Sequence, residues 1–360
     1  MSGERGTGNG EWGLPSSHAP VPAEAAAPAV REPTVSHASP LAAPRLSPLW
    51  PWLRVVALGL LSAAALRACV FEAYRIPSPS MEGTLLVGDL LFVSKVHVGA
   101  TLAGRRLPAL RPPRRGDVVV FHFPPGREVE IGDRAPYIKR VVGLPGDTVR
   151  IDAKQVVVNG APVATPPEAR LGWEVRTVGG TLPGAAMAAA GLDVPADRLG
   201  PGAWLVNATA DEAERLRAQP GMEAVHPYVR EPGDGSASFP ARLRFSLDDY
   251  GPVIVPRRGL TVTLDDDTWA TYRTAIERDE GVTTERTADG FLIGGRPATR
   301  YTFRRDYYFV LGDHRDDSSD SRTWGFVPAT HLIGVALLVY GSWDPDARRV
   351  RWERIGQPVE

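Results

Sequence analysis

The sequence predicts a mainly β protein with many turns, preceded by one hydrophobic helix. Glycine (37 residues) and proline (34 residues) together make up roughly a fifth of the chain, whereas average proteins contain roughly an eighth. After residue 75 the chain alternates between short apolar runs and turn signals, and one long apolar run precedes them. With 360 residues, 43% of them hydrophobic, the chain has enough apolar material for a sizeable core, and its length suggests about two domains.

Charge and cysteine content exclude several classes of function. Lysine plus arginine (41) nearly balances aspartate plus glutamate (42), so no electrostatic argument favours a nucleic-acid partner. The single cysteine, Cys69, excludes an internal disulfide and any multi-cysteine metal site. The acidic run Asp265–Asp267 lacks the spacing of metal ligands, and we interpret it as a solvated turn. We expect neither a metal nor a cofactor.

The N-terminal part of the chain divides into a tail and a hydrophobic run. Residues 1–46 are rich in glycine, proline and alanine without periodicity, which predicts a disordered tail, and with the topology expected below this tail would be cytoplasmic. We interpret residues 47–74 as a transmembrane anchor, although the charge-free centre, Val55–Leu66, amounts to only about 18 Å of helix. Arg54 and Arg67 bracket that centre and can extend their charged ends to the headgroups. A buried core helix and a cleaved signal peptide are the alternatives.

The rest of the chain contains several strand signals and one helix signal. Asn159-Gly160 directly follows an apolar run and is a strong signal for a two-residue β-hairpin. One helix is predicted over Asp211–Ala218, because acidic residues open it and Pro220-Gly221 ends it. Strand-like segments resume at 251–264 and run to Val339. The earlier predicted strands are Val118–Phe121, Tyr137–Val142, Thr148–Asp152 and Val156–Val158.

Two serines follow the hydrophobic run, in the segment Ile76–Leu85. Pro77 and Pro79 fix their own φ and push the residues before them into extended conformations. Because residues i and i+2 of an extended segment face the same way, Ser78 and Ser80 would present their hydroxyls side by side. Taken alone, such a serine–proline segment is also typical of a linker.

A lysine lies inside a second apolar segment, Tyr137–Asp147. A period of two places Lys139 on one face with Tyr137 and Val141. A lysine in an apolar strand commonly protects a sheet edge from aggregation. If Lys139 is instead buried, with no carboxylate close enough to oppose the effect, desolvation lowers its pKa and makes it a general base near neutral pH.

The third notable segment, Leu311–Gly325, is charged and rich in serine although apolar runs flank it. Six of its 15 residues are charged and three are serines. In isolation such a stretch is typical of a solvated loop.

Together these three segments resemble the type I signal peptidase family, which consists of membrane-anchored serine proteases with a Ser–Lys dyad. The family motifs P-S-x-S-M, R-G-D-[VI]-V-V-F, [YF]-[IV]-K-R-[VI]-[VI]-G-x-P-G-D and G-D-N-x-x-x-S-x-D-S-R all occur after the hydrophobic run, in the same order, the last with one substitution. The match covers roughly 70–164 and 248–345. The chain departs from the family pattern at Pro79, at Gly83 and at His314, where glycine, proline and asparagine respectively are usual.

The resemblance implies a signal-peptidase-like β-sheet core with an inserted accessory α+β region, preceded by one transmembrane helix. We expect the catalytic core to comprise residues 75–164 and 290–345, and the accessory region residues 165–289. Residues 346–360 are expected to form a C-terminal tail.

The resemblance also implies roles for individual residues. Ser80 would be the nucleophile and Lys139 the general base, and the Ser80 N–H with the Ser78 hydroxyl would form the oxyanion hole. Ser318 would hold the Lys139 amine in line. The supporting ion-pair network would consist of Asp313, Asp320, Arg322 and Arg140. The apolar pocket for a small substrate side chain would consist of Ile76, Ile138 and Tyr137.

The implied function is cleavage of N-terminal signal peptides from exported preproteins, after small residues of the Ala-x-Ala type. The implied partners are preprotein signal peptides and the lipid bilayer. We expect a monomer with one span in the bacterial inner (plasma) membrane and with residues 75–360 on the extracytoplasmic side. Two alternatives stay open: a self-cleaving repressor-type Ser–Lys protease, and a catalytically silent membrane-anchored β-scaffold that serves as an interaction protein.

Overall fold

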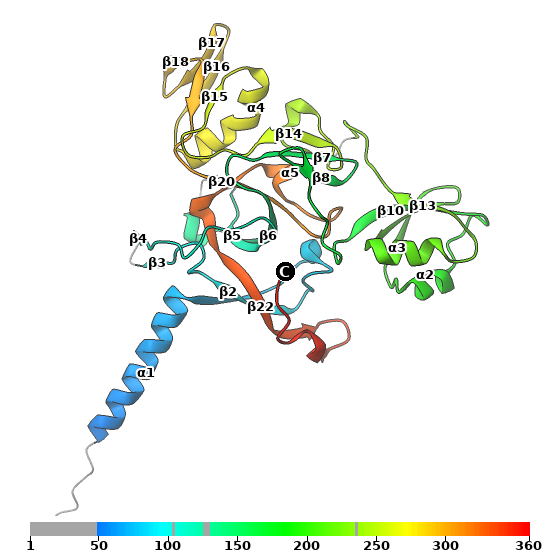
Figure 1. The fold of residues 1–360 in the computed structure, drawn as a ribbon, viewed down its shortest axis with the longest axis horizontal. Helices are drawn as coiled ribbons and strands as arrows, with labels where there is room; N and C mark the ends of the chain where they lie inside the picture. The colour runs from blue at the N-terminus through cyan, green and yellow to red at the C-terminus, as the bar shows by residue number, and fades with distance from the viewer. Residues whose placement is uncertain (1–48, 103–104, 125–129, 235–236) are drawn as a thin grey trace, which may run out of the picture. The chain divides into compact units, whose positions relative to one another are not determined.

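A computed structural model describes residues 49–102, 105–124, 130–234 and 237–360. The chain divides into two units, residues 1–54 and residues 55–360. Strands dominate the second unit, which confirms the predicted mainly β class (Figure 1). The predicted disordered tail, 1–46, lies outside the described residues.

The long apolar run folds as helix α1 (Leu49–Cys69). Its described side chains, from Trp50 to Ala64, are all exposed. Within the described ranges, no helix combines the length and the apolarity that a membrane crossing needs. The transmembrane anchor expected over 47–74 is therefore not confirmed and stays a prediction.

The largest sheet of the described chain has eight antiparallel strands, and its strand β6 carries four of the candidate residues, Tyr137, Ile138, Lys139 and Arg140. Its order is β1-β2-β22-β5-β6-β20-β21, and β23 pairs with β22. Strand β5 sends alternate side chains into two different apolar clusters, Val119 and Phe121 into one and Val118 and Val120 into the other. Because both faces of β5 are buried, its residues 118–121 are all apolar and do not alternate with polar residues. The bounds are β1 (Phe71–Arg75), β2 (Asp89–Ser94), β5 (Val118–His122), β6 (Pro136–Gly143), β20 (Tyr307–Leu311), β21 (Val327–Pro328), β22 (Leu332–Asp344) and β23 (Arg349–Val350).

A second sheet has the order β14-β7-β8-β9. The predicted hairpin is confirmed, because Val158 pairs with Ala161 across the two-residue turn. Asn159 and Gly160 have φ values of 53° and 84°, the left-handed conformation that this turn requires. The bounds are β7 (Thr148–Asp152), β8 (Gln155–Val158), β9 (Ala161–Pro162) and β14 (Tyr250–Ile254).

A third sheet and two helices form a separate apolar cluster, drawn in green in Figure 1. The sheet order is β11-β12-β10-β13. The predicted helix at Asp211–Ala218 is confirmed as α3, whose N-terminus is capped by Thr209 and Glu212 in a reciprocal pair of hydrogen bonds. The bounds are β10 (Leu171–Thr177), α2 (Gly184–Ala190), β11 (Ala196–Gly200), β12 (Ala203–Ala208), α3 (Ala210–Arg217) and β13 (Met222–Pro227).

One sequence interpretation is wrong, because the acidic run Asp265–Asp267 begins a helix and is not a turn. The Asp265 carboxylate accepts hydrogen bonds from the backbone N–H groups of Asp267 and Thr268 and so caps α4. The remaining elements are β3 (Thr101–Leu102), β4 (Arg105–Arg106), β15 (Thr261–Thr263), α4 (Asp266–Thr274), a π-helical turn (Ala275–Asp279), β16 (Thr284–Thr287), β17 (Gly290–Ile293), β18 (Arg296–Ala298), β19 (Arg300–Thr302), α5 (Ser321–Trp324) and the 3₁₀ turns η1 (Pro79–Met81), η2 (Ile131–Asp133), η3 (Ala241–Leu243), η5 (Ala329–His331) and η6 (Trp352–Arg354).

The predicted domain boundaries stay a prediction, and two contacts bear on them. Strand β14 pairs with β7, which joins residues 250–254 to residues 148–152 in one sheet. Near the C-terminus, the Arg354 guanidinium forms an ion pair with the buried Asp89 carboxylate at 2.6 Å. Residues on both sides of the expected boundaries therefore share sheets and ion pairs.

Candidate active site

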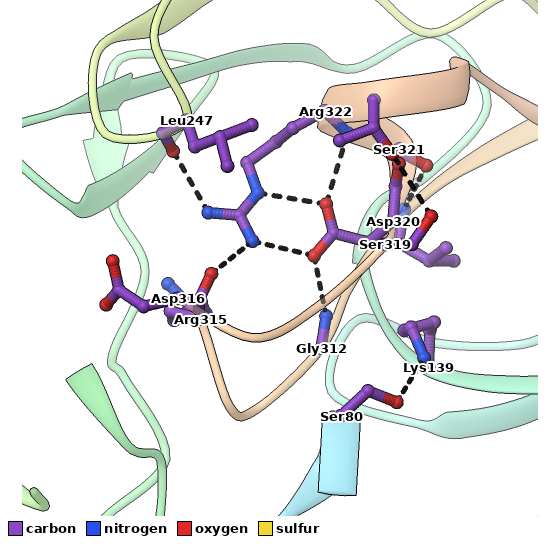
Figure 2. A network of polar contacts seen from close by, with 12 residues as sticks. Ser80, Lys139, Leu247, Gly312, Arg315, Asp316, Ser319, Asp320, Ser321 and Arg322 are labelled. Carbon is purple, nitrogen blue, oxygen red and sulfur yellow. Dashed lines mark hydrogen bonds and ion pairs between the residues drawn. The ribbon is translucent and has the colours of Figure 1, made fainter. Parts of the chain in front are cut away.

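Lys139 lies on an interior strand of the largest sheet. Strand β6 pairs with β5 over residues 136–140 and with β20 over residues 140–143, so at Lys139 it has a neighbouring strand on one side only. The side chain is buried, with 3% of the residue exposed. Its Nζ donates a hydrogen bond to Ser80 Oγ at 2.7 Å (Figure 2) and another to the Ile138 carbonyl oxygen at 2.8 Å. The amine is thus fixed against one serine hydroxyl.

Ser80 occupies the middle of the 3₁₀ turn η1, which begins with Pro79. Ser78, the residue before this turn, is extended, with φ −137° and ψ 156°. The Oγ atoms of Ser78 and Ser80 lie 3.5 Å apart, so the two hydroxyls are neighbours as expected, although Ser80 lies in a 3₁₀ turn and not in the extended segment that the sequence predicted. Both serines border a groove, and the alternative of a free linker does not fit this placement.

The protonation of Lys139 follows from its surroundings. Burial lowers the pKa of Lys139 from 10.5 to about 8, although the negative charges of Asp320 and Asp313 act to raise it. The expectation that no carboxylate opposes the effect is wrong in this respect. Both carboxylates are already paired with guanidinium groups, which limits their influence on the amine.

A groove of about 530 Å³ opens beside the Ser80–Lys139 pair. Two stretches of chain border it, residues 74–80 and residues 135–139. The structure therefore brings all three expected pocket residues to the same groove as the two expected catalytic residues. These five residues are Ile76, Tyr137, Ile138, Ser80 and Lys139.

Behind this pair, the loop after β20 packs closely on the turn that carries Ser80. The backbone N–H of His314 donates to the Ser80 carbonyl oxygen at 3.2 Å. A Cβ atom placed on Gly312 would lie 2.1 Å from Ser318 Oγ and 2.5 Å from the Ser80 carbonyl oxygen, so only glycine fits there without displacement. The loop thus fixes the backbone of the serine.

Ser318 does not make the contact expected of it. Its Oγ is buried and has no partner in hydrogen-bond geometry among the residues that the structure describes. It lies close enough to Asp320 to help lower the pKa of that carboxyl. The expected support of the Lys139 amine by this hydroxyl is therefore absent from the described contacts.

The expected ion-pair network is present as two buried pairs. The Arg140 guanidinium donates to both carboxylate oxygens of Asp313, at 2.8 and 2.7 Å. The Arg322 guanidinium does the same to Asp320, at 2.9 and 2.8 Å, and the Gly312 N–H donates to that carboxylate at 3.0 Å (Figure 2). Burial opposes ionisation of Asp320, but the adjacent Arg322 holds the pKa of that carboxyl below its usual range.

Sequence reasoning missed Thr84, a residue that belongs to the same network. Its hydroxyl donates to the Asp313 carboxylate at 2.6 Å and accepts from Arg140 at 3.3 Å. Thr84 follows Ser80 by four residues, so its position in the sequence is the available signal. It links the segment that carries Ser80 to the Arg140–Asp313 pair, which joins β6 to the loop after β20.

Asp316 is the second residue that sequence reasoning missed, and it connects the loop to the third sheet. Its carboxylate accepts from the buried Lys154 Nζ at 2.7 Å and from the Gly172 N–H at 2.6 Å, and it is paired with Arg230. Asp248 accepts from the same Lys154 amine at 2.8 Å. The loop behind Ser80 is therefore held by the sheet that contains β10.

Fold and site together define a class of protein: a β-sheet protein with a serine hydroxyl held against a buried lysine in an apolar groove. Such an arrangement suits a serine peptidase of the Ser–Lys type, because a neutral amine can replace histidine as the base. Residues 49–182 and 261–343 match the family model described as signal peptidase, peptidase S26. Since this match covers more than half of the chain, the protein belongs to the signal peptidase S26 family.

Individual relatives agree with that assignment. Signal peptidase I of Pseudomonas fluorescens is 28% identical over 291 residues, which are 77% of this chain and 67% of the relative. Signal peptidase I of Aquifex aeolicus is 28% identical over 283 residues, 79% of this chain and 80% of the relative. A crystal structure of a signal peptidase I from Enterococcus faecalis is 17% identical to this chain. The match covers 63% of this chain and 98% of the crystallised chain, with a TM-score of 0.22.

Proposed function

We propose that this serine endopeptidase removes N-terminal signal peptides from exported preproteins, with Ser80 as nucleophile and Lys139 as general base. The observation that carries the proposal is the 2.7 Å hydrogen bond between a buried lysine amine and a serine hydroxyl at the edge of an apolar groove. Membership of the S26 family and the signal peptidase I relatives support the substrate class.

The chemistry begins with the neutral form of Lys139. Its amine takes the proton of the Ser80 hydroxyl while Oγ attacks the carbonyl carbon of the scissile bond. The resulting ammonium then gives that proton to the leaving nitrogen, which becomes the new N-terminus of the mature protein. A water molecule, deprotonated by the same amine, hydrolyses the acyl group on Ser80 and restores both residues.

The oxyanion of the tetrahedral intermediate needs hydrogen-bond donors beside Ser80. We propose the Ser80 N–H and the Ser78 hydroxyl for this role, as expected from the sequence. Pro79 lacks an N–H group and so does not compete as a donor. The separation of 3.5 Å between the two hydroxyl oxygens supports this assignment.

The substrate segment is proposed to bind as an added strand. Strand β6 pairs with β5 over residues 136–140, whereas β20 pairs only with residues 140–143. One side of β6 over 136–139 therefore has no neighbouring strand in the described pairing, and an extended peptide can hydrogen-bond there. Ile76 and Ile138 beside this edge favour a small apolar side chain ahead of the cut.

Membrane attachment through α1 is also a proposal. The helix exposes large apolar side chains, among them Trp50 (60%), Trp52 (73%) and Leu61 (68%), which water solvates poorly. We propose a single-pass monomer in the bacterial inner membrane, with residues 75–360 on the extracytoplasmic side, where signal peptide ends emerge. Protease added to intact spheroplasts should then degrade the β-rich part, whereas its protection would contradict this orientation.

The decisive experiment is cleavage of a preprotein with an Ala-x-Ala site by the full chain in detergent. Ser80→Ala and Lys139→Ala should each abolish formation of the mature product, identified by its mass. Matched controls are Ser62→Ala, at an exposed position of α1, and the ion-paired Lys95→Ala, which should both cleave at the wild-type rate. Cleavage that persists without Ser80 would leave the silent-scaffold alternative, or a contaminating protease, as the explanation.

A further inference from the structure

One buried cation of the active-site loop lacks a partner. Arg315 is 4% exposed, yet no hydrogen bond or ion pair is recorded for its guanidinium within the described residues, and its Nε is fully enclosed. The nearby carboxylates of Asp313 and Asp320 favour the charged form of Arg315, but each is directly paired with another arginine, Arg140 or Arg322. A charge buried in this way is strongly unfavourable unless a counter-charge accompanies it.

Two hydrogen bonds hold the backbone of Arg315 in place. Its N–H donates to the Arg170 carbonyl oxygen at 2.9 Å, and its own carbonyl oxygen accepts from Arg322 Nη2 at 2.6 Å. Burial lowers the pKa of the Arg315 guanidinium to about 10, so the group still carries its charge at neutral pH. The guanidinium therefore keeps unpaired N–H donors that a counter-charge could use.

A cavity adjoins this side chain. It has a volume of about 380 Å³, and Arg315, Arg115 and Arg140 all line it. The Arg140 guanidinium is engaged by Asp313 and the Gly116 carbonyl oxygen. Arg115 is partly exposed, donates from Nη1 to the Val142 carbonyl oxygen at 2.6 Å and pairs from Nη2 with Asp147 at 3.1 Å. The cavity is distinct from the catalytic groove, since the two share no lining residue.

We propose that this cavity is a binding site for a phosphate-type oxyanion, with Arg315 as its principal ligand and Arg115 as the second. Guanidinium groups recognise such oxyanions by paired, charge-assisted hydrogen bonds. The carboxylates of Glu168 and Glu360 also border the cavity but are exposed, and neither is paired with Arg315. The bound anion would neutralise the loop that supports Ser80 without touching the reacting atoms.

The test is calorimetric titration of the full chain in detergent with inorganic phosphate, against chloride at equal ionic strength. Phosphate should bind saturably, with one site per chain. Arg315→Gln should weaken the binding roughly 10- to 100-fold, the loss expected for one charged hydrogen-bond partner. The exposed Arg296→Gln should bind as the wild type does.

Two further arms complete the experiment. If Arg315→Gln does not fold, Arg115→Gln replaces it and should also weaken binding. Vesicles of phosphatidylglycerol, compared with phosphatidylcholine, distinguish a lipid phosphate from the free ion, because a lipid ligand would give an Arg315-dependent increase in binding to the former only. Binding of neither probe above its control, or binding unchanged by the arginine substitutions, would overturn the proposal, and neither result depends on peptidase activity.

Discussion

The pH dependence of cleavage tests the proposed role of Lys139 most directly. The base must be neutral, and burial lowers the pKa of Lys139 to about 8. The neutral fraction then rises from roughly a tenth at pH 7 to roughly nine tenths at pH 9, so kcat/KM should rise about tenfold and level off above pH 9. A lysine at its ordinary value of 10.5 would instead give a rise of about 100-fold over the same range, with no plateau.

The assay is the initial rate of preprotein cleavage at substrate concentrations below KM, from pH 6 to pH 10. A direct measurement of the lysine itself is feasible, because the chain contains only three lysines, Lys95, Lys139 and Lys154. With lysine labelled by ¹³C at Cε, the resonance that disappears in Lys139→Met is assigned, and its titration should share the midpoint of the kinetic profile. A resonance that titrates above pH 10 beside a kinetic midpoint near 8 would refute the assignment of the base.

The remaining predictions concern stability and support of the site. Lys139→Met should raise the free energy of unfolding at pH 7 by up to about 3 kcal/mol, because a native pKa near 8 against 10.5 means that protonation favours the unfolded chain. The free energy of unfolding of the wild type should accordingly rise between pH 8 and 10.5. Urea unfolding of the wild type and of Lys139→Met at pH 7 and at pH 10 measures both the substitution and the pH effect. Equal stability of these two proteins at pH 7 would count against burial of the Lys139 amine. Gly312→Ala should lower kcat about 100-fold with little change in KM, because the added Cβ would displace the loop and the turn that carries Ser80. Gly184→Ala is the matched control, since the space around Gly184 is open. A rise in KM with kcat unchanged would contradict this reasoning. Asp316→Asn should cost about 3–5 kcal/mol in thermal unfolding, since it leaves buried cations short of a partner, and a shift below 1 kcal/mol would argue against that cluster. Ser78→Ala should reduce kcat about 10²- to 10³-fold in the cleavage assay, the loss of one oxyanion donor, and an unchanged kcat would remove this hydroxyl from the mechanism.

The sequence was sufficient for elements whose signals are local. The valine run of β5, the Asn159-Gly160 turn and the capped helix α3 all form from short-range rules and were predicted at nearly their observed bounds. Helix α4 was missed although its signal was present, because an aspartate that caps a helix was interpreted as part of a turn. Aspartate favours turns as well as helix N-caps, and the spacing of Trp269 and Tyr272, which places both on the buried side of α4, is the signal that distinguishes the two.

The site was predictable only in part, for a physical reason. Ser80 and Lys139 are 59 positions apart, and neither spacing nor periodicity brings them together. The resemblance to family motifs suggested that Ser80 and Lys139 form a pair. The partners of Thr84 and Asp316 depend on how distant segments pack together, which no sequence pattern indicated. The same limit explains Ser318, whose place against Gly312 is a matter of packing that no residue pattern encodes.

The order in which the ribosome delivers these segments has a consequence for the cell. The serine and the lysine emerge early, but the loop that fixes the Ser80 backbone follows β20 and ends near residue 320. At synthesis rates of about 5–20 residues per second, roughly 10–40 s separate the two events. During that interval Ser80 lacks the loop that fixes its backbone. A nascent chain is therefore expected not to cleave alanine-rich peptides, including its own hydrophobic segment. We therefore expect activity to begin only after residues up to about 320 have been synthesised and the loop has packed on the Ser80 turn.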